Sequence, residues 1–159
     1  WQGDHFSAHP VRGLRAMGRV YAGWAMSQAF YREKLYEQVG FSSLEDFLVR
    51  SWEANFLRRD AHDLLASLET WMASDISDNE IYQGDLGQAL GAITARSIVM
   101  PSRTDLYFTP EDSEMETAQM PNAEYRPIES IWGHRAGNPA LSPADEATLR
   151  QAVSDLLSS

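Results

Sequence analysis

The C-terminal part of the sequence alternates two short strand-like segments with two helical segments, and this order constrains the fold more than any other feature. Residues 97–100 are an apolar run between Arg96 and Pro101, and residues 123–128 resemble a second strand. Two strands joined by a helix run parallel, and such crossovers are right-handed in almost all cases. The sequence therefore predicts an α/β fold with a parallel sheet and flanking helices.

The helices around these strands have clear start and stop signals. Thr109-Pro110 predicts the start of a helix that ends before Pro121, and Ser142-Pro143 predicts the start of the last helix. Residues 130–141 are rich in Gly, Asn and Pro and are expected to form a loop. Two parallel strands alone do not make a stable sheet. We therefore expect further strands from a segment upstream of Trp1, where the sequence begins without an initiator Met.

The first ninety residues have the apolar spacing of amphipathic helices. One continuous helix is predicted over residues 11–28, which makes Ser27 an ordinary helical serine. Residues 42–45, Ser-Ser-Leu-Glu, predict a capping box before a second helix, and Asp60 precedes a third. Gly40 is a predicted C-terminal cap. Without a strand, these helices would form either a small bundle or a cap over another domain.

Charge and cysteine content exclude several classes of function. The 159 residues contain no cysteine, which rules out disulfide scaffolds, thiol nucleophiles and zinc–thiolate sites and is compatible with a cytoplasmic location. A net charge of -10 disfavours nucleic acid as a partner. The sequence has no apolar run of membrane-spanning length and no signal peptide, so we expect no membrane association. Arginines 12, 15, 19 and 32 suggest a solvated helix face or, alternatively, a channel for an anionic substrate.

Two side chains of catalytic type follow the predicted strands. Asp105 lies just after the first strand, and His134 lies just after the second. Parallel strands place their C-terminal ends on one edge of the sheet, which is where open α/β folds bind ligands. An acid and an imidazole brought together there are the orienting and basic members of a Ser–His–Asp triad. In α/β-hydrolases the nucleophile precedes the acid and the acid precedes the histidine.

The segment from 92 to 135 resembles the C-terminal end of an α/β-hydrolase of the homoserine O-acetyltransferase-like branch, which contains acyltransferases and related esterases. Residues 105–111 read D-L-Y-F-T-P-E, residues 121–123 read P-N-A, and residues 133–134 read G-H. The resemblance extends more weakly over residues 11–91. It implies a helical cap, or lid, at residues 1–91 and the C-terminal portion of the catalytic domain at 92–159, with the rest of the sheet upstream.

The resemblance implies catalytic roles for Asp105 and His134, and we add Trp132, Arg135 and Tyr107 as candidate substrate-binding residues. Homoserine-specific members usually have an acid after the catalytic histidine, whereas this sequence has Arg135. A cation there would repel a substrate ammonium group, so a neutral or anionic acyl ester is favoured. No G-x-S-x-G motif is present, and Ala25-Met26-Ser27-Gln28-Ala29 is its nearest imitation. The nucleophilic serine is therefore expected in an upstream segment or a companion chain.

These observations predict a serine-dependent acyl-transfer enzyme, either an ester hydrolase or an O-acyltransferase, acting on a small-molecule ester or acyl donor. The chemistry requires no cofactor and no metal, and His5, His9 and Asp4 are expected to belong to a flexible terminus rather than a metal site. The oligomeric state is open, with a homo-oligomer among the options. The alternative is a non-catalytic helical interaction module, or partner chain, that has no active site of its own.

Overall fold

A computed structural model describes residues 1–158, which form two compact units. The first unit contains residues 1–23 and 34–75, and the second contains residues 24–33 and residues from 76 onwards. The expected division into a cap at 1–91 and a catalytic portion from 92 is a functional one, and it stays a prediction because compactness alone does not test it.

The first unit is helical, as its apolar spacing predicts. Short helices follow one another with few connecting residues, because caps and glycines interrupt the chain: Gly40 has a φ of +91° just after one helix. The elements are α1 (Val11–Ala25, whose last two residues count with the second unit), α3 (Leu35–Gln38), α4 (Leu44–Phe47), η1 (Leu48–Glu53), α5 (Ala54–Leu57) and α6 (Ala61–Ala73).

The capping box forms one residue later than the sequence predicts. Ser43, not Ser42, is the N-cap of α4, and its side chain accepts a hydrogen bond from the Asp46 amide. The reciprocal carboxylate is Asp46, which accepts from both the amide and the hydroxyl of Ser42. Hydrogen bonds from Ser42 lower the pKa of Asp46 from its ordinary value. Glu45 is thereby free to pair with Arg19 of α1.

A π-helical segment, η1, joins α4 to α5, and its end is packed tightly against α1. A Cβ atom on Gly18 of α1 would lie 2.9 Å from the carbonyl oxygen of Trp52, so only glycine fits this approach. Glu53 is 2% exposed and binds both Arg15 and Arg19. Two of the N-terminal arginines therefore pair with a buried carboxylate, while their own side chains remain exposed, as the predicted solvated helix face requires.

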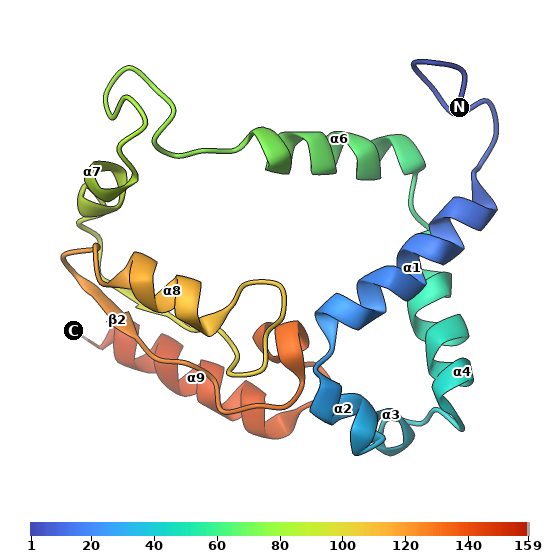
Figure 1. The fold of residues 1–159 in the computed structure, drawn as a ribbon. Coiled ribbons are helices and arrows are strands. Elements are labelled where there is room, and N and C mark those ends of the chain that lie inside the picture. Colours follow the sequence, from blue (N-terminus) through green and yellow to red (C-terminus); the bar gives the residue numbers. More distant parts are fainter. Residues whose placement is uncertain (159) are drawn as a thin grey trace. The chain divides into compact units, whose positions relative to one another are not determined.

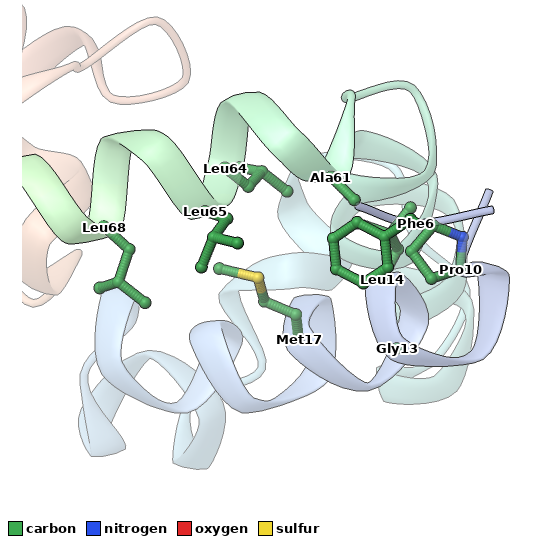
Figure 2. A pocket seen from close by; sticks show the side chains of 9 residues that line it. All are labelled: Phe6, Pro10, Gly13, Leu14, Met17, Ala61, Leu64, Leu65 and Leu68. Carbon is green, nitrogen blue, oxygen red and sulfur yellow. The ribbon is translucent and has the colours of Figure 1, made fainter. Parts of the chain in front are cut away.

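Helices α1 and α6 enclose an apolar cavity of about 210 Å³ within the first unit. Figure 2 shows Leu64, Leu65 and Leu68 of α6 on one side of this cavity and Leu14 and Met17 of α1 on the other. Helix α6 begins directly after Asp60, as predicted, and the Asp60 carboxylate caps it by accepting a hydrogen bond from the His62 amide. Capping of this kind contributes about 1 kcal/mol to helix stability.

The second unit contains the parallel sheet that the sequence predicts. Strands β1 (Ser97–Val99) and β2 (Ala123–Tyr125) pair in parallel, with Ile98 opposite Glu124. Helix α8 (Pro110–Thr117) connects them and packs against β2, while α9 (Pro143–Leu157) packs against β1. In Figure 1 the two helices lie on either side of the strands. The α/β fold class is therefore confirmed, and the residues of β1 are half-buried.

Three short elements complete the second unit: α2 (Gln28–Arg32), α7 (Leu86–Gly91) and the 3-10 helix η2 (Gly133–Gly137). The helix predicted to run continuously over residues 11–28 is interrupted, since α1 ends at Ala25 and Ser27 is the N-cap of α2. The apolar spacing continues across this break, but Ser27 adopts an extended conformation with a ψ of 160°. The spacing of apolar residues does not reveal such a break, because a serine that caps a second helix leaves that spacing unchanged. The helices of residues 1–158 include none with the length and apolar character that crossing a bilayer requires.

Candidate active site

Asp105 is held rigidly just beyond β1. The chain passes from the strand through Ser102, which forms an isolated parallel bridge with Ile128. Asp105 then turns back, and its Oδ1 accepts hydrogen bonds from the amides of Tyr107 at 2.8 Å and Phe108 at 3.2 Å. Only 7% of Asp105 is exposed. One carboxylate oxygen is thus occupied by the backbone, which fixes the direction of the other.

The second oxygen of Asp105 faces His134. Nδ1 of His134 lies 2.9 Å from Oδ2 of Asp105, and the imidazole is about one-third exposed. An ionised carboxylate only accepts hydrogen bonds, so Nδ1 carries the proton and Nε2 of the neutral ring is a proton acceptor. Within the part of the chain that the structure describes, no protein group binds Nε2. In this geometry the carboxylate can orient the imidazole, and Nε2 can accept a proton from a nucleophile.

His134 is presented by a turn that requires glycine before it. Gly133 has a φ of +61°, and a Cβ atom there would lie 2.7 Å from the amide nitrogen of Ser27. Both the backbone conformation and the close approach exclude a side chain at this position. The G-H pair of the sequence motif therefore has a physical basis in the packing of this turn against the N-terminus of α2.

Two aromatic rings pack on the imidazole. The ring centroids of Tyr107 and Phe108 lie 4.8 Å and 5.4 Å from that of His134. Both residues also line a cavity of about 420 Å³ whose other walls come from α7 and α8, including Met115 and the acidic Glu116. Tyr107, one of the predicted substrate-binding residues, is thereby placed between the imidazole and a cavity.

The other two predicted substrate-binding residues have different surroundings. Trp132 is half-buried and packs on Phe30 of α2 at a centroid distance of 5.2 Å. Arg135 follows His134 in η2, is half-buried, and forms no ion pair with any residue that the structure describes. Tyr107 thus contacts His134 through its ring and Arg135 is its neighbour in the chain, whereas the ring of Trp132 packs on Phe30.

Ser27 lies at the N-terminus of α2 with its hydroxyl fully engaged. Its Oγ donates a hydrogen bond to the carbonyl oxygen of Ile131 at 2.5 Å and accepts one from the amide of Phe30. Ser27 is 3% exposed. The residue that most nearly imitates a nucleophile in the sequence therefore caps a helix and tethers the loop before His134.

Sequence reasoning missed a set of buried and half-buried polar groups around the histidine loop. Thr104 donates to the Ser130 carbonyl, and Ser130 Oγ donates to the buried carboxylate of Asp145 at 2.8 Å. Trp132 in turn donates its amide to Ser130 Oγ. The adjacency of Thr104 to Asp105 was a usable signal, but nothing in the sequence marks Asp145 as buried.

The N-terminal histidines have ordinary partners. His5 pairs with Asp4, and His9 hydrogen-bonds the carbonyl oxygen of Leu57. Over residues 1–158, no three His, Asp or Glu side chains are grouped as they would be to hold a metal ion.

Comparison with known proteins places this geometry in a family. No family model matches the chain. It is 32% identical over 136 residues to a probable esterase of Corynebacterium glutamicum, which matches 84% of this chain and 38% of that protein. It is 34% identical over 128 residues to an ethyl acetate hydrolase of Pseudomonas veronii, covering 80% of this chain and 36% of that protein. A homoserine O-succinyltransferase of Methylibium petroleiphilum is 31% identical over 156 residues, covering 86% of this chain and 39% of the relative.

Two solved structures agree closely with the fold. The acetyl esterase MekB matches with a TM-score of 0.88 and 32% identity, over 94% of this chain and 42% of that one. An acetylester hydrolase from Corynebacterium glutamicum matches with a TM-score of 0.90 and 28% identity, over 99% of this chain and 45% of that one. The chain resembles the C-terminal portion of an α/β-hydrolase in both sequence and fold. The chain spans about two fifths of the length of the curated relatives it matches. The predicted resemblance to the branch of esterases and homoserine acyltransferases is confirmed.

Proposed function

We propose that this chain supplies the acid and the base of an α/β-hydrolase that hydrolyses small-molecule esters. The observation that carries the proposal is the 2.9 Å contact between Asp105 Oδ2 and His134 Nδ1, with the other Asp105 oxygen bound by two backbone amides. Relatives named as esterases support the same reaction class. A non-catalytic interaction module would give this pairing of a buried acid with a half-buried imidazole no purpose.

In the proposed reaction, a serine hydroxyl attacks the ester carbonyl and His134 Nε2 takes its proton. The imidazolium is stabilised by Asp105 and returns the proton to the departing alkoxide. A water molecule then repeats the sequence on the acyl-enzyme and releases the acid. An alcohol in place of water would make the same site an O-acyltransferase. Each step therefore uses His134 as a base and then as an acid.

We place the nucleophilic serine outside these 159 residues, in an upstream segment or a companion chain. No G-x-S-x-G motif is present in the sequence, and the Ser27 hydroxyl is committed to Ile131. The chain also spans only about two fifths of its relatives. We further propose that residues 1–91 act as the lid and that the enzyme works in the cytoplasm, which its lack of cysteine allows.

Substrate contacts are proposed for Tyr107, Arg135 and Trp132. Tyr107 both contacts the imidazole and lines the 420 Å³ cavity, so its ring would lie between His134 and an ester bound in that cavity. Arg135 has no anionic partner among residues 1–158 and favours a neutral or anionic acyl ester over one with an ammonium group. The role of Trp132 is the least direct, because its ring packs on Phe30.

The test uses the complete enzyme, including the part that carries the serine. His134→Gln should abolish turnover of p-nitrophenyl acetate, whereas His5→Gln, a change of an exposed terminal histidine, should leave turnover unchanged. A fluorophosphonate probe should label one serine, which peptide mapping would locate outside residues 1–159. Full ester turnover by the His134→Gln variant would refute the proposal. Comparing product formation with and without added alcohol separates hydrolysis from acyl transfer.

A further inference from the structure

We propose that the hydroxyl group of Thr104 is a positioning group that ties the loop carrying Asp105 to the loop carrying His134. This inference rests on the proposed function, because it assigns Thr104 a part in aligning that acid–base pair. Thr104 immediately precedes Asp105, and its side chain is half-buried between the two loops.

The backbone ladder that begins in the sheet holds the two loops in one register. Ser102 bridges Ile128 in parallel, the Arg103 amide donates to the Ile128 carbonyl at 3.0 Å, and the side chains of Arg103 and Glu129 pair. Arg103 and Glu129 are 26 residues apart in sequence. If the ladder continued unchanged, the next residues to face each other would also be 26 residues apart. Asp105 and His134, however, are 29 residues apart. The register therefore changes by three residues between the ladder and the proposed catalytic pair.

Thr104 lies where the separation changes from 26 to 29 residues, and its hydroxyl group forms one hydrogen bond at each separation. Its Oγ1 donates to the carbonyl oxygen of Ser130 at 2.8 Å, at a separation of 26 residues. The same oxygen accepts a hydrogen bond from the amide of Gly133 at 3.2 Å, at a separation of 29 residues. One hydroxyl group thus closes the short turn that contains the three additional residues.

The backbone alone does not close this turn. The Ser130 amide donates to the Ile128 carbonyl of its own loop, and the Trp132 amide is bound by the Ser130 side chain. The Ser130 carbonyl accepts from Thr104 Oγ1 at 2.8 Å and from Ser102 Oγ at 3.4 Å, and the Gly133 amide donates to Thr104 Oγ1. Without the hydroxyl, the buried amide of Gly133 would lose this partner, which carries a free-energy penalty that the loop can relieve by moving.

Movement of Gly133 would displace His134, the next residue. The Thr104 hydroxyl binds Ser130 and Gly133 rather than the imidazole, so its effect on the reaction would come through the position of the ring. A misplacement of about 1 Å in a catalytic group can cost about 100-fold in rate. The loss should therefore fall on kcat, with little change in KM.

The experiment compares two substitutions of Thr104 in the complete enzyme. Thr104→Val keeps the shape and removes the hydroxyl, whereas Thr104→Ser keeps the hydroxyl and removes a methyl group. We expect Thr104→Val to lower kcat for p-nitrophenyl acetate by about 10- to 100-fold with KM within about 3-fold, and Thr104→Ser to stay within about 3-fold of the wild type in both constants. Thr148→Val, the same change at an exposed position in α9, should have no effect.

Three outcomes would overturn the proposal. Wild-type kcat in Thr104→Val would show that the hydroxyl is not needed, and equal losses in Thr104→Val and Thr104→Ser would show that the methyl group matters instead. If His134→Gln is itself active, the proposed function fails and takes this inference with it; if His134→Gln is inactive while Thr104→Val is normal, only the Thr104 inference fails. Should Thr104→Val not fold, Thr104→Cys, with its weaker donor, replaces it and must fall below Thr104→Ser in kcat.

Discussion

Ser27 and Ile131 are 104 residues apart in sequence and are joined by a hydrogen bond of 2.5 Å from the Ser27 hydroxyl to the Ile131 carbonyl oxygen. This contact fixes the loop that carries His134 to the N-terminus of α2. The same hydroxyl accepts from the Phe30 amide, so it serves the helix and the loop together. A residue that the sequence offers as a weak nucleophile candidate therefore has a structural task beside the proposed active site.

Replacing Ser27 with Ala should weaken the enzyme without removing its nucleophile. The change removes an N-cap, which costs about 1 kcal/mol of stability, and leaves the Ile131 carbonyl without this partner. We expect a lower melting temperature and partial activity in the complete enzyme, with fluorophosphonate labelling retained. Ser67→Ala, which removes an exposed hydroxyl bonded within α6, is the control. Complete loss of labelling in a folded Ser27→Ala variant would make Ser27 the nucleophile.

Replacing Gly133 with Ala should disturb the histidine loop. The new Cβ would meet the Ser27 amide nitrogen at 2.7 Å, and the φ of +61° is unfavourable for alanine. We expect a fall in melting temperature and a loss of at least about 10-fold in kcat as His134 shifts. Gly137→Ala is a matched control at the other end of η2, because a Cβ there meets no atom within 4 Å. Equal behaviour of the two variants would contradict the close packing described for Gly133.

Replacing Asp105 with Asn should leave the fold intact and remove most of the activity. An asparagine amide can donate to Nδ1, which would hold the imidazole in the tautomer whose Nε2 carries the proton and cannot act as a base. Enzymes with a Ser–His–Asp triad lose about 10⁴-fold in kcat on this change, and we expect a loss of the same order here. Steady-state kinetics on p-nitrophenyl acetate measure it. Asp78→Asn, at an exposed position in the same unit, should be neutral, and an active Asp105→Asn variant would remove Asp105 from the triad.

The Glu53 network should make stability depend on pH. Hydrogen bonds from Arg15 and then Arg19 lower the pKa of Glu53 from its ordinary value of 4.5. A carboxyl group whose pKa is lower in the folded state contributes stability above its unfolded pKa and loses that contribution as pH falls through the folded value. The melting temperature of the wild type should therefore exceed that of Glu53→Gln near pH 7, and the difference should shrink below about pH 4.5.

Glu69→Gln is the matched control for this pH dependence. Glu69 lies on the exposed face of α6 in the same unit, so its substitution should leave the melting temperature unchanged at each pH. A Glu53→Gln difference that stays constant from pH 7 to pH 4 would contradict the role given to the ion pairs. The comparison uses melting curves of the same protein preparation at each pH.

The sequence predicted the elements that depend on local chemistry. Thr109 caps α8 as its pattern indicated, because its hydroxyl reaches the Asp112 amide three residues on. The alternation of strands and helices correctly predicted the parallel pairing of β1 with β2. The sequence-based prediction of the capping box was wrong by one residue. Ser42 and Ser43 each have an acid three residues later, and the structure uses Ser43 with Asp46.

The meeting of Asp105 with His134 was predicted from topology, because parallel strands bring their C-terminal ends to one edge. By itself the sequence determined the order of strands and helices and the presence of an acid and a histidine after the strands. Only the tertiary structure decided that Ser27 lies outside α1 and hydrogen-bonds the Ile131 carbonyl. It also decided that Asp145 is buried against Ser130 and that Thr104 lies where the register changes. These contacts join residues distant in sequence, and their energies depend on burial and on side-chain direction, which no local pattern records.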